Sequence, residues 1–329
     1  MFVEDIGEEK VALVYDTDVD GVVSAALILI VFKKMGKKIK KSIPMGFGDI
    51  ERLKTRLKRF EKIITVDVPI DLIEKHLLDI EKKMLIIDHH PGKDLTSEKI
   101  ILINPRMESP KIYQPTSYVV YKMFKNLLKD KKWAAAVGTV GDLGVENCKD
   151  LVKINSKKNI WKSKFGKAAM LLGASISVLG PEKTLQILLN SRNLEELVKN
   201  KKMISASKKF DQELERCEKE FEKNLESYGR ILVSKIKPRY RGVCSALITK
   251  LSIENPENII FVFEDKKNII RIHGRNGSGE VDVGKLFREL KIGGGHEKAG
   301  AGNIDKKDEE KLKSEILSKL TVFMDKKVI

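Results

Sequence analysis

The stretch of sequence that decides the fold is VALVYDTDVDG, residues 11–21. Its first five residues are largely apolar, which predicts a short buried β-strand. Three carboxylates follow at alternate positions, Asp16, Asp18 and Asp20, and this spacing places them on one side of an extended chain. Gly21 permits a sharp turn into residues 21–34, whose apolar pattern predicts a helix. Because ligands bind at the carboxyl ends of parallel strands, this acidic turn is a candidate site.

The alternation of strand and helix continues to about residue 150. Further strands are predicted over residues 40–45, 62–66, 84–87 and 100–103, and helices over 50–59 and 70–78. Such alternation indicates βαβ units and a parallel sheet. We therefore expect an α/β fold that begins with a parallel-sheet domain carrying helices on both faces.

The middle of the chain is predicted to be helical, and strands return after it. Helical spacing covers residues 117–128, 133–141, 167–179 and 182–189, followed by a long charged segment over 194–228. Strand patterns cover residues 230–235, 259–264 and 268–273, before a glycine-rich passage and a lysine-rich terminal helix. We expect a first domain over residues 1–195, a helical linker over 196–235 and a smaller α/β domain over 236–329.

Composition limits the class of protein. The chain has 329 residues, of which 33% are charged and 42% hydrophobic, so a disordered chain and a membrane protein are excluded. The start of the chain lacks a signal-peptide pattern, and Cys148, Cys217 and Cys244 are widely separated. These features favour a reducing compartment, and we expect a cytoplasmic protein with no membrane partner.

The net charge favours a polyanionic partner. Lys and Arg number 63 against 47 Asp and Glu, which gives a formal charge of +16. Clustered basic side chains gain affinity by displacing counterions from phosphates. The alternative is thermal adaptation, because Lys- and Glu-rich composition is also typical of hyperthermophile proteins.

Acidic residues and histidines also follow the other predicted strands. Asp67 follows residues 62–66, and Asp88, His89 and His90 follow residues 84–87. Asp142 lies in GTVGDLG, residues 138–144, where we expect a turn after an apolar helix. Clustered carboxylates repel one another unless cations are present, and mixed carboxylate and imidazole ligation suits Mn²⁺. Two such ions would activate a water molecule and stabilise in-line displacement at phosphorus.

Each piece alone has an ordinary interpretation. The acidic run could belong to a calcium loop, but position 12 of that loop is Leu27 in place of the EF-hand glutamate. Asp67 could cap a helix, and the two histidines could be packed or exposed without a metal. Only the combination favours a metal centre.

The combination resembles the DHH phosphoesterase superfamily, named for the triplet at residues 88–90. All four motifs of that superfamily occur in order, at residues 16–21, 67, 88–90 and 142. GGGHEKAGAG, residues 293–302, is similar to the signature of the DHH-associated domain. Aspartates throughout the first motif, with the chain length and charge, are similar to those of compact archaeal RecJ-like nucleases.

The resemblance implies a role for each motif residue. One Mn²⁺ would be bound by Asp20, Asp67, His89 and Asp142, and a second by Asp16 and Asp18 with Asp67 bridging. Mg²⁺ is the alternative ion. Asp88 would orient the imidazoles and His90 would contact the scissile phosphate.

The resemblance also implies substrate-binding residues near the C-terminus. They are Arg275, Asn276, Ser278, Gly293, Gly294, Gly295 and His296. The three glycines are expected to form a turn before a helix, where backbone N–H groups could bind phosphate. Taken alone, the glycines indicate a plain turn and Arg275 a solvated charge.

We therefore expect a Mn²⁺-dependent, two-metal phosphodiesterase that acts as a RecJ-like exonuclease on single-stranded DNA or RNA. The alternatives are a phosphodiesterase for short oligonucleotides or cyclic dinucleotides, a nucleotide phosphatase, and a replication or repair scaffold bound to a helicase complex. Self-association into a homo-oligomer is a further alternative that the sequence leaves open.

Overall fold

The acidic turn follows strand β1 (Val11–Asp16), which lies inside a five-stranded sheet of order β2-β1-β3-β4-β5. The other strands are β2 (Lys41–Met45), β3 (Lys62–Val66), β4 (Lys83–Ile87) and β5 (Ile100–Ile103). Every neighbouring pair is parallel, so all five carboxyl ends meet at one edge of the sheet. The predicted parallel sheet is confirmed.

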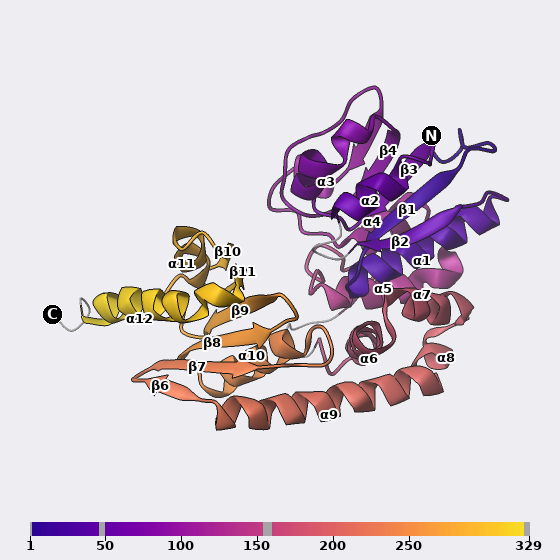
Figure 1. The fold of residues 1–329 in the computed structure, drawn as a ribbon. Coiled ribbons are helices and arrows are strands. Elements are labelled where there is room, and N and C mark those ends of the chain that lie inside the picture. Colours follow the sequence, from indigo (N-terminus) through magenta and orange to yellow (C-terminus); the bar gives the residue numbers. More distant parts are fainter. Residues whose placement is uncertain (1, 46–49, 154–159, 326–329) are drawn as a thin grey trace. The chain divides into compact units, whose positions relative to one another are not determined.

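The computed structural model describes residues 2–45, 50–153 and 160–325. It divides the chain into two compact units, Met1–Ser207 and Lys208–Ile329 (Figure 1). None of the described helices is long and apolar enough to cross a membrane.

Side chains of β1 alternate between two apolar cores, one on each face of the first sheet. Leu13 and Tyr15 belong to one core and Ala12 and Val14 to the other, as the two-residue period of a strand requires. The first core contains residues of α1 (Val19–Lys34), α4 (Thr116–Met123), α5 (Lys132–Gly141), α6 (Lys164–Leu179), α7 (Pro181–Asn190) and α8 (Leu194–Val198). The second contains residues of α2 (Ile50–Leu57) and α3 (Ile70–His76). Helices therefore cover both faces, as predicted.

The predicted helical segment over residues 194–228 is divided into α8, α9 (Lys201–Lys223) and β6 (Glu226–Tyr228). Asn200 separates the two helices, because its side-chain oxygen accepts hydrogen bonds from the N–H groups of Lys202 and Met203. This capping pattern starts a new helix at α9.

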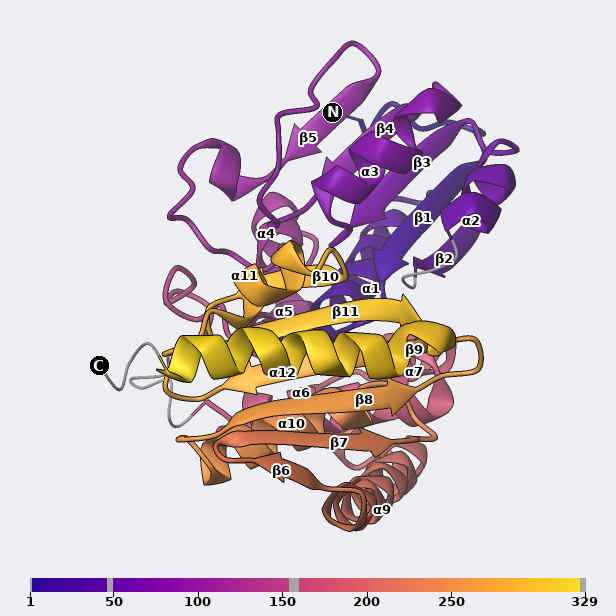
Figure 2. The same cartoon turned by 60° about the vertical axis from the view of Figure 1, so that its left-hand side comes forward.

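The second unit contains a mixed sheet of order β10-β11-β9-β8-β7-β6. Its remaining strands are β7 (Ile231–Ile236), β8 (Ile259–Asp265), β9 (Ile269–Asn276), β10 (Gly293–His296) and β11 (Ala299–Asp305). One face packs against α11 (Val283–Glu289) and α12 (Glu309–Asp325), and the other against α9 and α10 (Val243–Glu254). Figure 2 shows α12 in front of this sheet and α10 behind it. Among the residues that the structure describes, short 3₁₀ helices lie at Leu78–Ile80, Pro105–Met107, Lys129–Lys131 and Lys306–Asp308.

The predicted glycine turn is wrong. Gly293–His296 form edge strand β10, which is antiparallel to β11 and follows helix α11. Two other glycines, Gly284 in α11 and Gly300 in β11, allow close packing of this helix against the sheet. A Cβ atom at Gly284 would lie 2.4 Å from the carbonyl carbon of Gly295, and one at Gly300 would lie 3.1 Å from Val283 Cγ1.

Gly284→Ala is expected to lower the free energy of unfolding of the second unit by about 1–3 kcal/mol, because the added methyl group meets backbone atoms. The matched control is Gly173→Ala in α6, where the nearest atom to a Cβ is Val19 Cγ2 at 3.6 Å. That substitution should be neutral or stabilising by up to about 1 kcal/mol, the helix preference for Ala. Chemical denaturation measures both changes, and equal effects would contradict the packing argument.

Candidate metal centre

Asp67 lies directly after β3 in a left-handed backbone conformation, with φ of 61°. Such a conformation is strained for a residue other than glycine, and it is typical of functional sites. The backbone N–H of Asp67 donates to Ile87 O at 3.0 Å, which keeps the residue attached to β4. Its buried Oδ1 accepts from the Thr116 hydroxyl at 2.9 Å, whereas Oδ2 has no hydrogen-bond partner among the described residues.

The acidic turn after β1 depends on Gly21. A Cβ atom there would lie 2.4 Å from Asp16 O, so this close return of the chain excludes other residues. Asp18 caps α1 by accepting from Gly21 N at 2.8 Å. Asp20 is buried in the first turn of the same helix.

Asp20 is held by the first turn of α4. Its carboxylate accepts from Thr116 N at 2.6 Å, from Ser117 N at 3.1 Å and from the Ser117 hydroxyl. Backbone N–H groups at a helix N-terminus stabilise negative charge. A Cβ atom at Gly138 would lie 2.4 Å from Ser117 Oγ, so α5 also approaches this point closely. Gly138 lies in helix α5, as predicted for residues 133–141, and Asp142 follows the helix.

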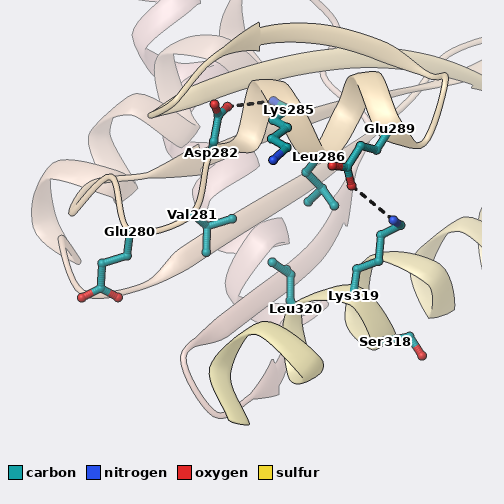
Figure 3. A pocket seen from close by; sticks show the side chains of 9 residues that line it. All are labelled: Glu280, Val281, Asp282, Lys285, Leu286, Glu289, Ser318, Lys319 and Leu320. Carbon is teal, nitrogen blue, oxygen red and sulfur yellow. Dashed lines mark hydrogen bonds and ion pairs between the residues drawn. The ribbon is translucent and has the colours of Figure 1, made fainter. Parts of the chain in front are cut away.

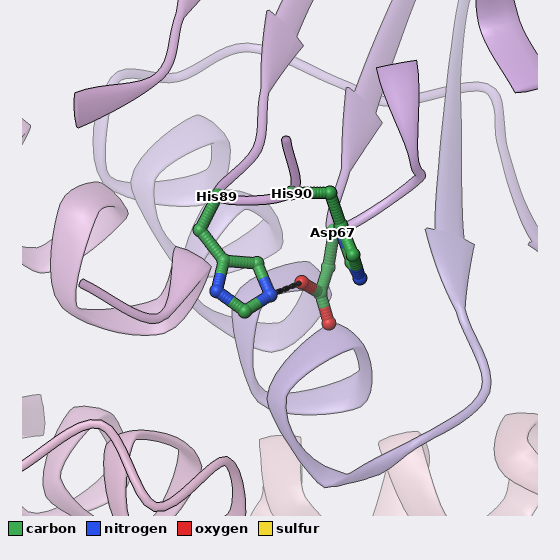
Figure 4. Close-up of side chains that lie close together, drawn as sticks. All are labelled: Asp67, His89 and His90. Carbon is green, nitrogen blue, oxygen red and sulfur yellow. Dashed lines mark ion pairs between the residues drawn. The ribbon is translucent and has the colours of Figure 1, made fainter. Parts of the chain in front are cut away.

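The two histidines after β4 have different surroundings. His89 Nε2 lies 3.3 Å from both Asp67 Oδ1 and Asp142 Oδ2, and Figure 4 shows the imidazole directed at the Asp67 carboxylate. His89 Nδ1 is buried without a partner in the described part of the chain. His90 Nδ1 lies 2.8 Å from Asp88 Oδ1, and the His90 side chain is 34% exposed.

The structure brings all six predicted ligands together in two adjoining groups. Candidate ligand atoms within 4.8 Å of one another are supplied by Asp16, Asp18 and Asp67 in one group, and by Asp20, His89 and Asp142 in the other. Asp67 and His89, 3.3 Å apart, join the groups, and Asp67, His89 and His90 form a third overlapping set. Two cations that share one carboxylate would fit this arrangement.

Two family models match the chain. The model for the DHH family, N-terminal domain, matches residues 10–140, and the model for the DHHA1 domain matches residues 229–322. The chain belongs to the DHH superfamily.

Solved structures share the fold of this DHH protein at low sequence identity. RecJ of Thermus thermophilus in complex with Mn²⁺ has a TM-score of 0.70 at 15% identity, over 93% of this chain and 51% of the RecJ chain. Exonuclease RecJ bound to manganese has a TM-score of 0.67 at 16% identity, over 95% and 91%. The pGpG-specific phosphodiesterase PggH of Vibrio cholerae has a TM-score of 0.51 at 14% identity, over 95% and 99%. The chain thus spans about half of the Thermus protein, and its fold is RecJ-like. A search of curated proteins finds no match.

Burial and mutual repulsion dominate the electrostatics of the DHH site. Desolvation by the surrounding protein, with the charges of Asp16 and Asp142, raises the pKa of Asp18 to about 6, although the outer surface of this residue is exposed. Burial and neighbouring carboxylates raise the pKa values of Asp20 and Asp67 well above their usual range. Burial lowers the pKa of His89, so this imidazole is neutral and able to bind a metal. The cluster must therefore take up protons or cations, and its oxygen-rich donor set fits Mn²⁺ or Mg²⁺.

Sequence reasoning missed five residues that hold the site. They are Asn104, Arg106, Tyr113, Thr116 and Ser117. Arg106 Nε donates to His89 O at 2.7 Å, and Asn104 Nδ2 donates to His90 O at 2.8 Å. The Tyr113 hydroxyl lies 2.6 Å from Asp142 Oδ2, beneath the Arg106 guanidinium. The available signals were Asn104-Pro105 after a predicted strand and Thr116-Ser117 before an apolar helix.

The predicted substrate residues of the DHHA1 domain differ in accessibility. Asn276 is buried, with its amide donating to Val281 O and its oxygen accepting from Ser278 Oγ, so these two residues shape a turn. Arg275 is half-buried on β9, and its guanidinium donates to Gly274 O at 3.0 Å. Gly293, Gly295 and His296 are exposed on the edge strand and Gly294 is half-buried there.

A separate pocket of about 630 Å³ lies between α11 and α12 (Figure 3). Val281, Leu286 and Leu320 line it, and Lys319 pairs with Glu289 at 3.2 Å beside it. None of its described lining residues belongs to the predicted site.

Tyr113→Phe is expected to weaken Mn²⁺ binding by about 10–100-fold, the usual effect of removing an outer hydrogen bond to a metal ligand. The ring and its contacts with Arg106 and His89 are preserved, so folding should be unchanged. Calorimetric titration with Mn²⁺ measures the affinity. Tyr118→Phe is the control, because its hydroxyl bonds Asp150 and no predicted ligand. Equal affinities for both variants and the parent chain would contradict the role of Tyr113.

The increase in unfolding temperature that saturating Mn²⁺ produces is expected to become smaller as the pH falls toward about 6. The metal-free folded chain has raised carboxyl pKa values, with that of Asp18 at about 6 against 3.8 for the free side chain. Between these values the folded state binds more protons than the unfolded state, so acid relieves the repulsion that the ion relieves at higher pH. Thermal unfolding with Mn²⁺ or a chelator at several pH values measures the difference. Stabilisation that grows as the pH falls would contradict this prediction.

Proposed function

We propose that this protein is a Mn²⁺-dependent phosphodiesterase that degrades single-stranded DNA or RNA from an end, as a RecJ-like exonuclease. The observation that carries the proposal is the pair of ligand groups joined by Asp67 and His89. Asp20, Asp67, His89 and Asp142 would bind one ion, and Asp16, Asp18 and Asp67 the other. Bound ions would lower the pKa of a water molecule and stabilise charge on the phosphate; Mg²⁺ could take the same ligands.

The surrounding side chains would keep the ligands in place. The first turn of α4 holds Asp20 by two backbone N–H groups and a hydroxyl, and Thr116 fixes one oxygen of Asp67. Fixed ligands need no rearrangement when ions bind, which favours affinity and catalysis.

His90 would act on the substrate phosphate. Asp88 holds its Nδ1 atom at 2.8 Å, which leaves Nε2 for a phosphate oxygen. Burial opposes protonation of His90, but the hydrogen bond and charge of Asp88 outweigh burial and raise its pKa. An imidazolium at this position would favour an anionic substrate.

A nucleic-acid substrate is supported by charge and by the exposed groups of the DHHA1 domain. The formal charge of +16 favours a polyanion over a small neutral molecule. Arg275, His296 and the backbone of the Gly293–Gly295 edge strand would contact the phosphates. The buried Asn276 would support them through its turn with Ser278. A replication or repair helicase complex and self-association remain proposals for partners.

Asp67→Asn is expected to abolish degradation of end-labelled single strands in Mn²⁺, because both ligand groups lose their shared carboxylate. His90→Gln should retain metal binding and slow turnover by about 100–1,000-fold, the scale for a lost transition-state hydrogen bond. Asp130→Asn is the control, since it removes an exposed carboxylate paired with Lys34. Gel analysis of digestion time courses measures all three.

A length series separates this proposal from a dinucleotide or short-oligonucleotide phosphodiesterase. An exonuclease should shorten strands of any length stepwise from one end, whereas an oligonucleotide phosphodiesterase should lose activity beyond a few nucleotides. Absence of degradation of both DNA and RNA at every length, by a chain that binds Mn²⁺, would overturn the proposal.

A further inference from the structure

Three side chains of metal-binding type meet in the second unit, and none of them is among the predicted ligands or substrate-binding residues. Cys244 lies in the first turn of helix α10, Glu264 lies near the end of β8, and His273 lies on β9. Their candidate ligand atoms all lie within 4.8 Å of one another, and His273 Nε2 is 2.9 Å from Glu264 Oε2. Rigid elements therefore bring a thiol, a carboxylate and an imidazole to one point.

Strand register explains this meeting. Val262 pairs with His273 across β8 and β9, so both side chains lie on one face of the sheet, and Glu264 lies two residues further along the same face. Val262 packs in the core formed with α10, which also contains Cys244. The sheet thus presents Glu264 and His273 to the first turn of α10.

The three side chains are buried, with exposed fractions of 1% for Cys244, 5% for Glu264 and 7% for His273. A buried carboxylate and a buried imidazole destabilise an apolar core unless they form a hydrogen bond with each other or bind a ligand. Burial lowers the pKa of His273, so its ring is neutral and can supply a lone pair. Burial raises the pKa of the Cys244 thiol, which is therefore protonated unless a cation replaces the proton.

We propose that Cys244, Glu264 and His273 form a separate site for a zinc-type transition metal ion in the second unit. Thiolate, imidazole and carboxylate are the ligand types that Zn²⁺ uses, and three protein ligands leave a fourth position for water. Binding would release the Cys244 proton to solvent, and the thiolate and carboxylate charges would together balance the dication. The ion would tie α10 to β8 and β9, two residues from Arg275.

Lys266 competes with such an ion. Its ammonium lies 3.1 Å from Glu264 Oε1, whereas His273 contacts Oε2 of the same carboxylate. Removing this positive charge should strengthen metal binding if the cluster is a metal site. A purely structural Glu264–His273 pair would show no such gain.

Titration of the full chain with Co²⁺, after treatment with a chelator, tests the proposal. Thiolate ligation of Co²⁺ gives a near-ultraviolet charge-transfer band, and the predicted ligands of the DHH site contain no sulfur, so the band reports this cluster alone. We expect the band of the parent chain to reach the intensity of one thiolate-bound ion per chain once Co²⁺ exceeds the amount that the DHH ligand groups bind. We expect complete loss in Cys244→Ser, and a tighter titration in Lys266→Gln. Co²⁺ should also raise the thermal unfolding temperature of the parent chain.

Cys217→Ser is the matched control, because Cys217 lies in the same core, is equally buried, and stands outside the ligand group. It should keep the band, and His273→Gln should weaken binding even if Cys244→Ser fails to fold. Absence of the band in the folded parent chain, or its persistence in Cys244→Ser, would overturn the proposal, as would its loss in Cys217→Ser. The result does not depend on nuclease activity.

Discussion

Repulsion among carboxylates that cluster at one edge of a parallel sheet is the constraint on which the first unit depends. Asp20 and Asp67 are buried, Asp16 and Asp142 are half-buried and Asp18 is exposed, and the five carboxylates approach one another in two adjoining groups. Their mutual repulsion would open the site if only apolar residues surrounded it. The fold opposes it with the first turn of α4, whose N–H groups and hydroxyls face Asp20 and Asp67, and with the neutral imidazole of His89. Bound cations would neutralise the repulsion that remains between the carboxylates.

The same constraint explains the costly local features of the chain. Asp67 has a left-handed backbone conformation. Gly21 allows the carbonyl oxygen of Asp16 to lie 2.4 Å from the place that a Cβ atom would occupy, and Gly138 allows α5 to approach Ser117 closely. Each feature sacrifices conformational preference for the position of a carboxylate. Burial of apolar side chains in the two cores, one on each face of the sheet, offsets the unfavourable free energy of these conformations.

Much of the site could be predicted because its ligands follow predicted strands. The alternation of strands and helices places Asp16, Asp67 and His89 at one sheet edge without further information. The residues that hold them could not be predicted, because Thr116 and Ser117 act across 49 to 97 residues of sequence and carry only a weak capping pattern. The edge strand at residues 293–295 could not be predicted for a related reason. A Cβ atom at Gly293 or Gly295 would lie 2.1 Å from a carbonyl oxygen of β11, so their small size serves close pairing with that strand, a tertiary feature that local sequence does not express.

The most direct measurement is anomalous X-ray diffraction at the manganese absorption edge from crystals of the full chain grown with Mn²⁺. The account predicts two peaks in the first unit, about 3.5–4 Å apart as in other two-metal sites, with the Asp67 carboxylate bound to both. One peak should contact Asp20, His89 and Asp142, and the other Asp16 and Asp18. A single ion, or two ions neither of which contacts Asp67, would contradict the account.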